Sequence, residues 1–473
     1  MIVNWINIEI GKILNVSRGG SPRPIKTFLT KQLDGINWIK IGDTKENTKY
    51  IQATAEKIKP SGISKTRLVK RGDLLLSNSM SYGRPYILKI DGAIHDGWLV
   101  ISNKDNINVE KDFLFYVLSS PIVFTQFEQL AKGSTVKNLN TGIVERVKIP
   151  YFPLPEQRTI VSKIEELFSE LDNGIANLKA AKNKLEIYRQ AVLKKAFEGK
   201  LSEQDGKGLN DGQDENENNN HVHPVNLSKS CSDNGRLPNG WKWVKLGEVC
   251  DINPKIENKK TYSEELDVQF VPMKLVDAII DKIHLSEVRK FKEVNKGSYT
   301  YFEEGDVIFA KVTPCMENGK IAVAKNLVNK IGFGSSEFHV LRCSPVLLNQ
   351  YLFFYVVQSK FRNQAQHAMT GAVGLRRVPK KFIEDYYFPL PPTIAEQQSI
   401  VSAIESRLSV CDKLAESIDQ GLEKAEALRQ SILKKAFEGK LLSESELEAC
   451  RKEPDWEPAE RLLERLNTIK KIK

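Results

Sequence analysis

Residues 189–201 read Arg-Gln-Ala-Val-Leu-Lys-Lys-Ala-Phe-Glu-Gly-Lys-Leu, and residues 429–441 repeat them as Arg-Gln-Ser-Ile-Leu-Lys-Lys-Ala-Phe-Glu-Gly-Lys-Leu. The match extends backwards at the same offset of 240 residues, because Glu156-Gln157 aligns with Glu396-Gln397. A repeat at a fixed offset is the signature of a duplicated structural unit. The chain therefore has two related halves, and these stretches define their alignment.

Both copies have the features of a long helix. A Pro-rich entry at 152–155 and 388–392 cannot continue a helix from upstream, whereas Gly199 and Gly439 suit its C-cap. Apolar residues recur at heptad spacing, at Ile164, Leu171, Leu178, Leu185 and Val192 in the first copy and Ile404, Cys411, Ile418, Ala425 and Ile432 in the second. Such stripes predict that the two copies pack as an antiparallel coiled coil. The alternative is that each helix faces the core of an ordinary domain.

The composition is that of a globular protein with several domains. The 473 residues are 41% hydrophobic, and no apolar run approaches a membrane span. We expect a cytoplasmic protein without membrane contact. The six cysteines are scattered without a C-x-x-C pair, which predicts neither a disulfide framework nor structural zinc. His221 and His223 form an H-x-H pair in a polar stretch, and we expect no metal there.

The net charge of +10 is concentrated in the two segments that precede the long helices. Residues 1–150 contain 22 basic against 13 acidic side chains, and residues 236–387 contain 23 against 17. We call these segments the first and second modules. Basic modules on a nearly neutral scaffold indicate polyanion binding. The alternative is a charge dispersed for solubility.

Each module reads as an α+β domain of about 150 residues with short strands and one or two helices. Gly72-Asp73 in the first module and Gly305-Asp306 in the second introduce matching apolar strands. After these strands the copies diverge, and loops that diverge on a shared framework are typical sites of specificity. We predict that the following residues bind the polyanion, which the family resemblance given below implies is DNA: Arg18, Arg23, Lys26, Asn78, Ser79, Tyr82, Arg84, Ser134, Thr135, Lys137 and Asn138 in the first module, and Lys311, Thr313, Asn318, Lys320, Arg376, Arg377, Lys380 and Lys381 in the second.

The remaining segments connect these parts or extend beyond them. The predicted organisation is 1–150 first module, 151–201 long helix, 202–235 flexible polar linker, 236–387 second module, 388–441 long helix and 442–473 tail. The linker has almost no apolar residue, which is typical of a tether. In the tail, Asp455 and Pro458 predict the start of one short helix.

Motifs for catalysis are missing. No G-x-x-x-x-G-K-[ST] occurs, and Asn253-Pro254-Lys255 stops short of the Asn/Asp-Pro-Pro-aromatic motif of an amino-methyltransferase. His95-Asp96 near Ser102 has no G-x-S-x-G elbow, so we interpret it as a surface pair. We predict a non-catalytic chain without a cofactor of its own.

The ordered set of motifs resembles the specificity subunit of a type I restriction-modification system. The residues that carry the resemblance are the opening at 237–248, the two Phe-Pro-Leu-Pro entries followed by Glu-Gln-x-x-Ile-Val, the two Leu-Lys-Lys-Ala-Phe-Glu-Gly-Lys-Leu ends and the Glu-Pro-Ala-Glu-x-Leu-Leu tail. The resemblance covers nearly the whole chain. One departure is the insertion Pro392-Thr393-Ile394-Ala395 before the second long helix.

The resemblance implies two target-recognition domains separated by an antiparallel pair of conserved helices, with each domain reading one half of a bipartite site in double-stranded DNA. It also implies two methyltransferase subunits that carry S-adenosylmethionine, and restriction subunits that use ATP and Mg. A helix of about 40 residues is about 60 Å long, the length of roughly 18 base pairs, so it suits a spacer between two such domains.

A partner present in two copies needs two equivalent surfaces, and the long helices repeat best. We therefore predict partner contacts at Lys194, Lys195, Phe197, Lys434, Lys435 and Phe437. The alternative for both phenylalanines is that they close a core. Two other classes of protein remain open: a coiled-coil adaptor whose basic modules bind acidic proteins without reading DNA, and a DNA enzyme such as a methyltransferase.

Overall fold

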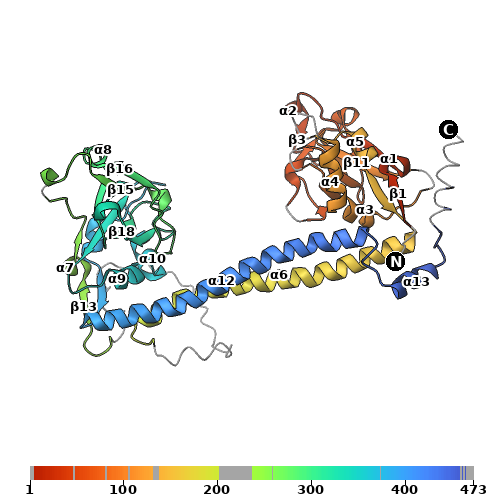
Figure 1. Ribbon diagram of the computed structural model, residues 1–473. Coiled ribbons are helices and arrows are strands. Elements are labelled where there is room, and N and C mark those ends of the chain that lie inside the picture. Colours follow the sequence, from red (N-terminus) through yellow and green to blue (C-terminus); the bar gives the residue numbers. More distant parts are fainter. Residues whose placement is uncertain are drawn as a thin grey trace. The chain divides into compact units, whose positions relative to one another are not determined.

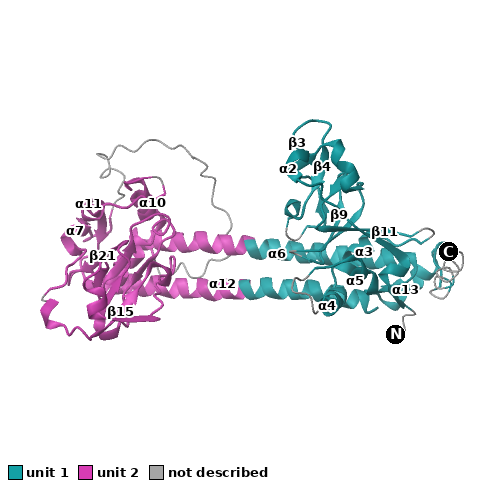
Figure 2. Cartoon of the chain, turned by 90° about the horizontal axis from the view of Figure 1, so that it is seen from above, with its two compact units in different colours: residues 1–179, 419–473 teal, residues 180–418 magenta. Residues whose placement is uncertain are grey.

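The computed structural model describes residues 5–45, 48–79, 82–104, 107–131, 138–201, 237–257, 259–372, 374–458, 461 and 464 (Figure 1). The chain forms two compact units, residues 1–179 with 419–473 and residues 180–418, which we call unit 1 and unit 2 (Figure 2). Unit 1 contains the first module and unit 2 the second. None of the described helices is both long and apolar enough to cross a membrane.

The two long helices are α6 (Leu154–Phe197) and α12 (Ile394–Phe437), each of 44 residues. Their first and last residues obey the 240-residue offset of the sequence repeat. The insertion at 392–395 therefore leaves the length of the helix unchanged. Pro392 and Thr393 lie between strand β22 (Tyr387–Leu390) and α12, and Ile394 and Ala395 are the first two residues of α12.

The helices run antiparallel. In unit 1, Asp172 of α6 forms an ion pair with Arg429 of α12, and Leu178 lies against Gly421, so rising numbers on one helix meet falling numbers on the other. In unit 2, Arg189 forms an ion pair with Asp412. The two ion pairs correspond to each other under the 240-residue repeat, which confirms the predicted antiparallel pair of helices and the internal repeat.

The seam between the helices is less buried than the heptad pattern predicts. Leu171, Leu178 and Leu185 are only half-buried, whereas Cys411 and Ala425 are buried. A pair of helices encloses less volume than a bundle, because its seam remains open at both edges. The full 2 to 5 kcal/mol expected for truncating a buried leucine is therefore an overestimate at these positions.

The first module contains three sheets. Strand β1 (Ile6–Glu9) pairs antiparallel with β12 (Lys148–Tyr151) and joins the two ends of the module. A five-stranded sheet has the order β2 (Leu14–Arg18), β11 (Trp98–Asn103), β8 (Leu74–Ser77), β9 (Pro85–Leu88) and β5 (Tyr50–Ile51). A second has the order β3 (Leu29–Thr30), β6 (Glu56–Ile58), β4 (Ile36–Ile39), β10 (Gly92–Ile94) and β7 (Arg67–Val69). The helices are α1 (Ile10–Ile13), α2 (Ile25–Phe28), α3 (Lys111–Leu118), α4 (Pro121–Leu130) and α5 (Thr141–Arg146).

The second module repeats this plan with shorter sheets. Strand β13 (Lys242–Lys245) pairs with β22. One sheet has the order β14 (Cys250–Ile252), β21 (Phe338–Cys343), β18 (Val307–Ala310) and β19 (Ile321–Val323), and the other has β16 (Glu287–Lys290), β15 (Asp267–Val271), β20 (Ile331–Gly334) and β17 (Thr300–Glu303). The helices are α7 (Leu246–Val249), α8 (Phe291–Val294), α9 (Asn349–Val356), α10 (Ser359–His367) and α11 (Lys380–Glu384). The predicted α+β class is confirmed.

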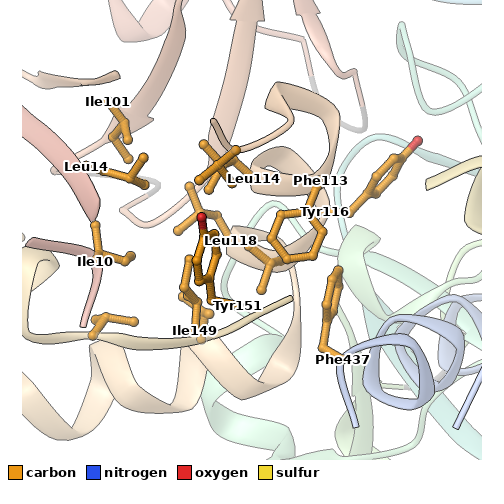
Figure 3. Packing of buried hydrophobic residues seen from close by; sticks show 14 of the residues in the cluster. Ile10, Leu14, Ile101, Phe113, Leu114, Tyr116, Leu118, Ile149, Tyr151 and Phe437 are labelled. Atoms are coloured by element: carbon orange, nitrogen blue, oxygen red, sulfur yellow. The ribbon is translucent and has the colours of Figure 1, made fainter. Parts of the chain in front are cut away.

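Each module's core is closed by the end of the helix from the other copy. In unit 1, the Phe437 ring packs 5.6 Å from Phe113 of α3 (Figure 3). In unit 2, the Phe197 ring packs 4.9 Å from Tyr351 and 5.0 Å from Tyr355 of α9. Phe197 is 6% exposed and Phe437 is 4% exposed. The predicted partner contact of these two phenylalanines therefore needs correction, since burial in a core leaves them no free surface.

The start of each long helix is fixed to its own module by a tryptophan. Trp5 Nε1 donates a hydrogen bond to Glu156 Oε2 (2.9 Å), and Trp241 Nε1 donates one to Glu396 Oε1 (2.7 Å). In unit 1 a second indole, that of Trp456 in the tail, donates to Glu156 Oε1 (3.1 Å). The tail therefore covers the helix start in unit 1.

The described part of the tail contains helix α13 (Glu444–Arg451), which begins with a capping box between Ser443 and Glu446. This helix was not predicted. Asp455 and Pro458 are themselves not helical, and beyond Pro458 the structure describes only Arg461 and Glu464, so the helix expected there stays a prediction. The predicted linker at 202–235 also lies outside the described residues.

Candidate nucleic-acid interface

The loops that diverge between the modules lie together in each, and the same backbone hydrogen bonds join them. Leu139 N donates to Asn78 O (2.8 Å) in the first module, and Val378 N donates to Lys311 O (2.9 Å) in the second. A further loop, the turn before β11 or β21, is joined to them in the same way. Asn78 N donates to Gly97 O (2.9 Å), and Lys311 N donates to Glu337 O (2.9 Å).

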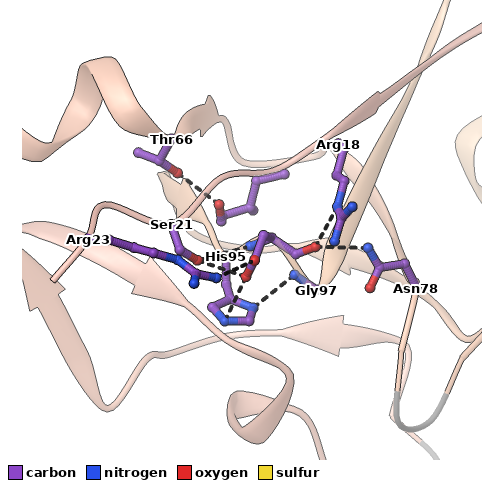
Figure 4. Close-up of polar contacts among 9 residues, drawn as sticks. Arg18, Ser21, Arg23, Thr66, Asn78, His95 and Gly97 are labelled. Carbon is purple, nitrogen blue, oxygen red and sulfur yellow. Dashed lines mark hydrogen bonds and ion pairs between the residues drawn. The ribbon is translucent and has the colours of Figure 1, made fainter. Parts of the chain in front are cut away.

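In the first module this turn is organised around Asp96, whose partners Arg18, Ser21, Arg23 and Asn78 are labelled in Figure 4. The Ser21 hydroxyl donates to Asp96 Oδ1 (2.8 Å), and the backbone carbonyl of Asp96 accepts from Arg18 Nε (3.0 Å) and Asn78 Nδ2 (2.8 Å). The guanidinium of Arg23 lies 3.5 Å from Asp96 Oδ2. One residue therefore holds three segments of the module together, and two of the predicted arginines lie beside it.

The charges at this turn affect each other's protonation. Partial burial opposes ionisation of Asp96, but the Ser21 hydrogen bond and nearby positive charges hold the pKa of this carboxyl below its usual value. Partial burial lowers the pKa of His95, although the adjacent Asp96 carboxylate, 2.9 Å from His95 Nε2, works in the opposite direction. The carboxylate therefore stays charged near neutral pH.

The predicted residues of the first module have different environments. Arg84 is exposed, and its side chain makes no hydrogen bond or ion pair with any residue that the structure describes. Tyr82 stacks on Phe124 with 5.7 Å between ring centroids. Arg18, Arg23 and Lys26 are exposed, whereas Ser79 and Asn138 are half-buried. Ser134, Thr135 and Lys137 lie outside the described residues.

The prediction that Asn78 contacts DNA needs correction. Its side chain is 1% exposed, because it lies beneath the turn and donates to the Asp96 carbonyl. It shapes the loop that carries Arg84 and has no surface to offer a ligand.

In the second module four of the predicted cations are paired with acidic side chains. Arg377 forms a bidentate pair with Glu337, with Nε–Oε2 at 2.8 Å and Nη2–Oε1 at 2.7 Å. The hydrogen bond from Arg377 holds the pKa of the Glu337 carboxyl below its usual value. Arg376, Lys380 and Lys381 lie 3.9, 3.1 and 3.0 Å from Glu317, Glu384 and Asp385. To bind another anion such as a phosphate, each of these cations must first release its carboxylate partner.

The loops at 311–320 and 370–378 form one cluster around these arginines. Thr313 N donates to Arg376 O (3.1 Å), and Thr313 Oγ1 donates to Gly374 O (3.1 Å). Asn318 is exposed and Lys311 half-buried. The prediction that Lys320 contacts DNA needs correction. Its ammonium donates hydrogen bonds to Met273 O (3.0 Å) and Val276 O (2.8 Å) and so holds a neighbouring loop in place.

The side chains of these two loop clusters are of the types that bind ligands. Arginine, lysine, threonine and asparagine are donors suited to phosphates and base edges. Among the described residues, no group of three or more His, Cys, Asp or Glu side chains is placed to hold a metal ion. Sequence reasoning missed Ser21 and Glu337, and it treated Asp96 only as part of a rejected hydrolase pair. The signal it could have used is the acidic residue in the turn just before β11 or β21 in both modules.

The four lysines predicted to contact a partner, Lys194, Lys195, Lys434 and Lys435, are exposed at the ends of α6 and α12. Lys434 lies 3.9 Å from Glu438 on the same helix. Their role in binding a partner stays a prediction.

A family model described as the type I restriction modification DNA specificity domain matches residues 2–186 and 238–424. The EcoEI specificity subunit of Escherichia coli is 37% identical over 198 residues, which are 42% of this chain and 32% of that relative, so the matched stretch spans about a third of the relative's length. The EcoBI specificity subunit of the same species is 22% identical over 463 residues, covering 93% of this chain and 87% of the relative.

Two solved structures share the fold. The HsdS subunit from Thermoanaerobacter tengcongensis has a TM-score of 0.53 at 21% identity and covers 92% of this chain and 97% of that chain. A chain from a study of complex assembly and conformational transition of the type I R-M system has a TM-score of 0.66 at 20% identity, covering 93% of this chain and 99% of its own. Likeness at this identity shows the arrangement of elements alone.

Proposed function

Because the chain belongs to the type I restriction-modification DNA specificity family, we propose that it is a non-catalytic subunit that reads a bipartite site in double-stranded DNA. Residues 1–150 and 236–387 are the two target-recognition domains, and each reads one half of the site. The long helices at 151–201 and 388–441 connect them, with a flexible linker at 202–235 and a tail at 442–473.

The observation that carries this proposal is the duplicated loop cluster. Both modules use equivalent backbone hydrogen bonds, from Leu139 to Asn78 and from Val378 to Lys311, to hold loops whose side chains differ. A common frame with different side chains is what two readers of different half-sites require, because phosphate contacts position a protein while base contacts specify the sequence. The excess positive charge of both modules supports the same interpretation.

The partners are inferred from the internal repeat. Two methyltransferase subunits, which carry S-adenosylmethionine, dock on the pseudo-equivalent surfaces of α6 and α12, near the exposed lysines at 194–195 and 434–435. Restriction subunits that use ATP and Mg complete the assembly. The surfaces are equivalent because the helices have equal lengths and the same ion pairs under the 240-residue offset.

Methylation mapping tests the proposal. The chain is expressed with its methyltransferase subunit, and the genome is sequenced at single-base resolution for methylated adenine or cytosine. Methylation confined to one bipartite sequence, and lost when this chain is deleted, is the expected result. Methylation that persists without the chain would contradict the proposal. A complex whose DNA affinity did not fall with added salt would favour the adaptor class, since neutralising phosphates releases counterions.

A further inference from the structure

Two cysteines of the second module lie directly opposite each other on neighbouring strands. Cys250 is the first residue of β14 and Cys343 the last of β21, and they are partners in the antiparallel register. Two other pairs in the same register, one on each side, are joined by backbone hydrogen bonds, from Ser344 N to Val249 O (2.9 Å) and from Asn253 N to Val340 O (2.8 Å). Hydrogen-bonded and non-hydrogen-bonded pairs alternate along such a ladder, so Cys250 and Cys343 form a non-hydrogen-bonded pair.

This position suits a disulfide bond. Residues of a non-hydrogen-bonded pair have Cα atoms about 4.5 Å apart, within the range of roughly 4.4 to 6.8 Å that disulfides adopt. Both side chains leave the same face of the sheet, because partners in a register share a face. The register therefore suits a disulfide between these two strands.

The two thiols differ in accessibility. Cys250 is 6% exposed, whereas Cys343 is half-buried. The hydrogen bond with Cys343 and burial together raise the pKa of the Cys250 thiol. Since the thiolate is the nucleophile, Cys343 is the residue that meets an oxidant first and Cys250 is the one that resolves the product.

We infer that Cys250 and Cys343 form a redox-modification site, in which a low-molecular-weight disulfide such as glutathione disulfide converts the pair of thiols to an intramolecular disulfide. The Cys343 thiolate attacks one glutathione sulfur, and the first glutathione leaves as a thiolate that takes up a proton. The Cys250 thiolate then attacks Cys343 Sγ and expels the second glutathione, which is protonated in turn. Two cysteine thiols are oxidised, and one glutathione disulfide is reduced to two glutathione thiols.

The first module lacks this site. The equivalent position in its sheet pairs Leu14 with Asn103. Oxidation should therefore stabilise the second module alone, by closing about 90 residues of its chain into a loop that restricts the unfolded state. The candidate DNA loops lie next to Phe338, at the other end of β21, so the bond should leave DNA binding unchanged.

The test uses the full chain, reduced and then incubated with glutathione disulfide. Remaining thiols are blocked with iodoacetamide, and the protein is digested without reduction for mass spectrometry. We expect a peptide in which Cys250 and Cys343 are cross-linked, together with a higher thermal unfolding midpoint that dithiothreitol reverses. Cys343→Ser should abolish both effects, and Cys315→Ser, which changes another partly exposed cysteine of the same module, should retain them.

Two results would overturn the inference. One is recovery of Cys343 as a mixed disulfide with glutathione and no cross-link to Cys250, which would mean that the pair does not resolve. The other is full alkylation of both thiols after incubation, which would mean that the pair does not react with a disulfide. Cys250→Ala gives a second check, because it should leave Cys343 trapped as the mixed disulfide in a chain whose circular dichroism is unchanged.

Discussion

The candidate DNA loops of the two modules have the same backbone frame but hold their arginines differently. Arg84 of the first module is exposed, with no partner among the described residues, whereas Arg377 of the second is held by two hydrogen bonds from its guanidinium to Glu337. The corresponding turn of the first module carries Asp96, which holds Ser21 and lies near Arg23. The frame and the side chains that we propose to read DNA can therefore change separately, which suits the two different readers of our proposal.

In contrast to the loops, the hydrophobic cores of the two modules are closely alike. The end of α12 closes the first module, and the end of α6 closes the second, in each case through a phenylalanine. We predict that Phe437→Ala and Phe197→Ala each lower the free energy of unfolding by about 3 to 5 kcal/mol, the loss typical of a buried phenylalanine. Hydrogen exchange measured by mass spectrometry should show faster exchange in α3 for Phe437→Ala and in α9 for Phe197→Ala.

Exposed apolar residues on the same helices provide matched controls. Leu428 is 50% exposed on α12 and Ile187 is 69% exposed on α6, so Leu428→Ala and Ile187→Ala should change stability little. Faster exchange of α9 in the Phe437→Ala variant would contradict the crossed arrangement in which each helix closes the module of the other copy.

The second prediction concerns Arg84. Arg84→Ala should weaken DNA binding of the complex by about 1 to 3 kcal/mol and relax the sequence at one position if Arg84 contacts a base. If it contacts a phosphate, binding to all sequences should weaken alike and the salt slope should fall by about one. Fluorescence anisotropy across a salt series measures both. Unchanged affinity, slope and methylation pattern would remove this loop from the interface.

The third prediction uses the ion pair between Arg377 and Glu337 of the second module. Glu337→Gln should free Arg377 and raise the affinity for all DNA sequences by a few-fold, because exposed ion pairs are weak and the carboxylate also repels phosphate. The salt slope should become steeper. Glu304→Gln is a control, since Glu304 accepts hydrogen bonds from Asn326 N and Leu327 N away from the arginines. Equal affinity of Glu337→Gln and the parent would show that Arg377 does not contact DNA.

The fourth prediction is a pH dependence from a buried histidine. Burial lowers the pKa of His339, whose Nε2 is 2.8 Å from Val378 O and whose Nδ1 is 3.0 Å from Asn253 Nδ2. Between this lowered pKa and the usual histidine pKa of about 6.5, the unfolded state therefore binds more protons than the folded state. The contribution of neutral His339 to the free energy of unfolding is present above about pH 6.5 and is lost as the pH falls toward the lowered pKa. Urea unfolding from pH 7 to 5 should show this loss in the parent and a flatter profile in His339→Gln. An equal slope in both would contradict it.

The large elements could be predicted from the sequence because their signals are local. The Pro-rich entries, heptad spacing and glycine caps predicted α6 and α12, and the 240-residue offset predicted their equivalence. The insertion at 392–395 did not change the length of the helix, because its last two residues form the start of α12. The α+β modules were predicted from short apolar strands and turns in matching order.

The details of the site could not be predicted because they depend on contacts between residues far apart in the chain. Arg377 and Glu337 are 40 residues apart, and Lys320 donates to carbonyls more than 40 residues before it. A cation in a loop looks equally available in the sequence whether or not it has such a partner. The pairing of Cys250 with Cys343 was hidden for the same reason, since only the register of β14 and β21 brings them together.

Exchanging one module tests whether each module reads its own half-site. Residues 1–150 are replaced with the corresponding module of another family member, and the methylated sites of the resulting complex are mapped at single-base resolution. We predict that one half of the bipartite site changes while the other half stays the same. A chimaera that methylates with the parental sequence in both halves, or with both halves changed, would contradict this division of the site between the two modules.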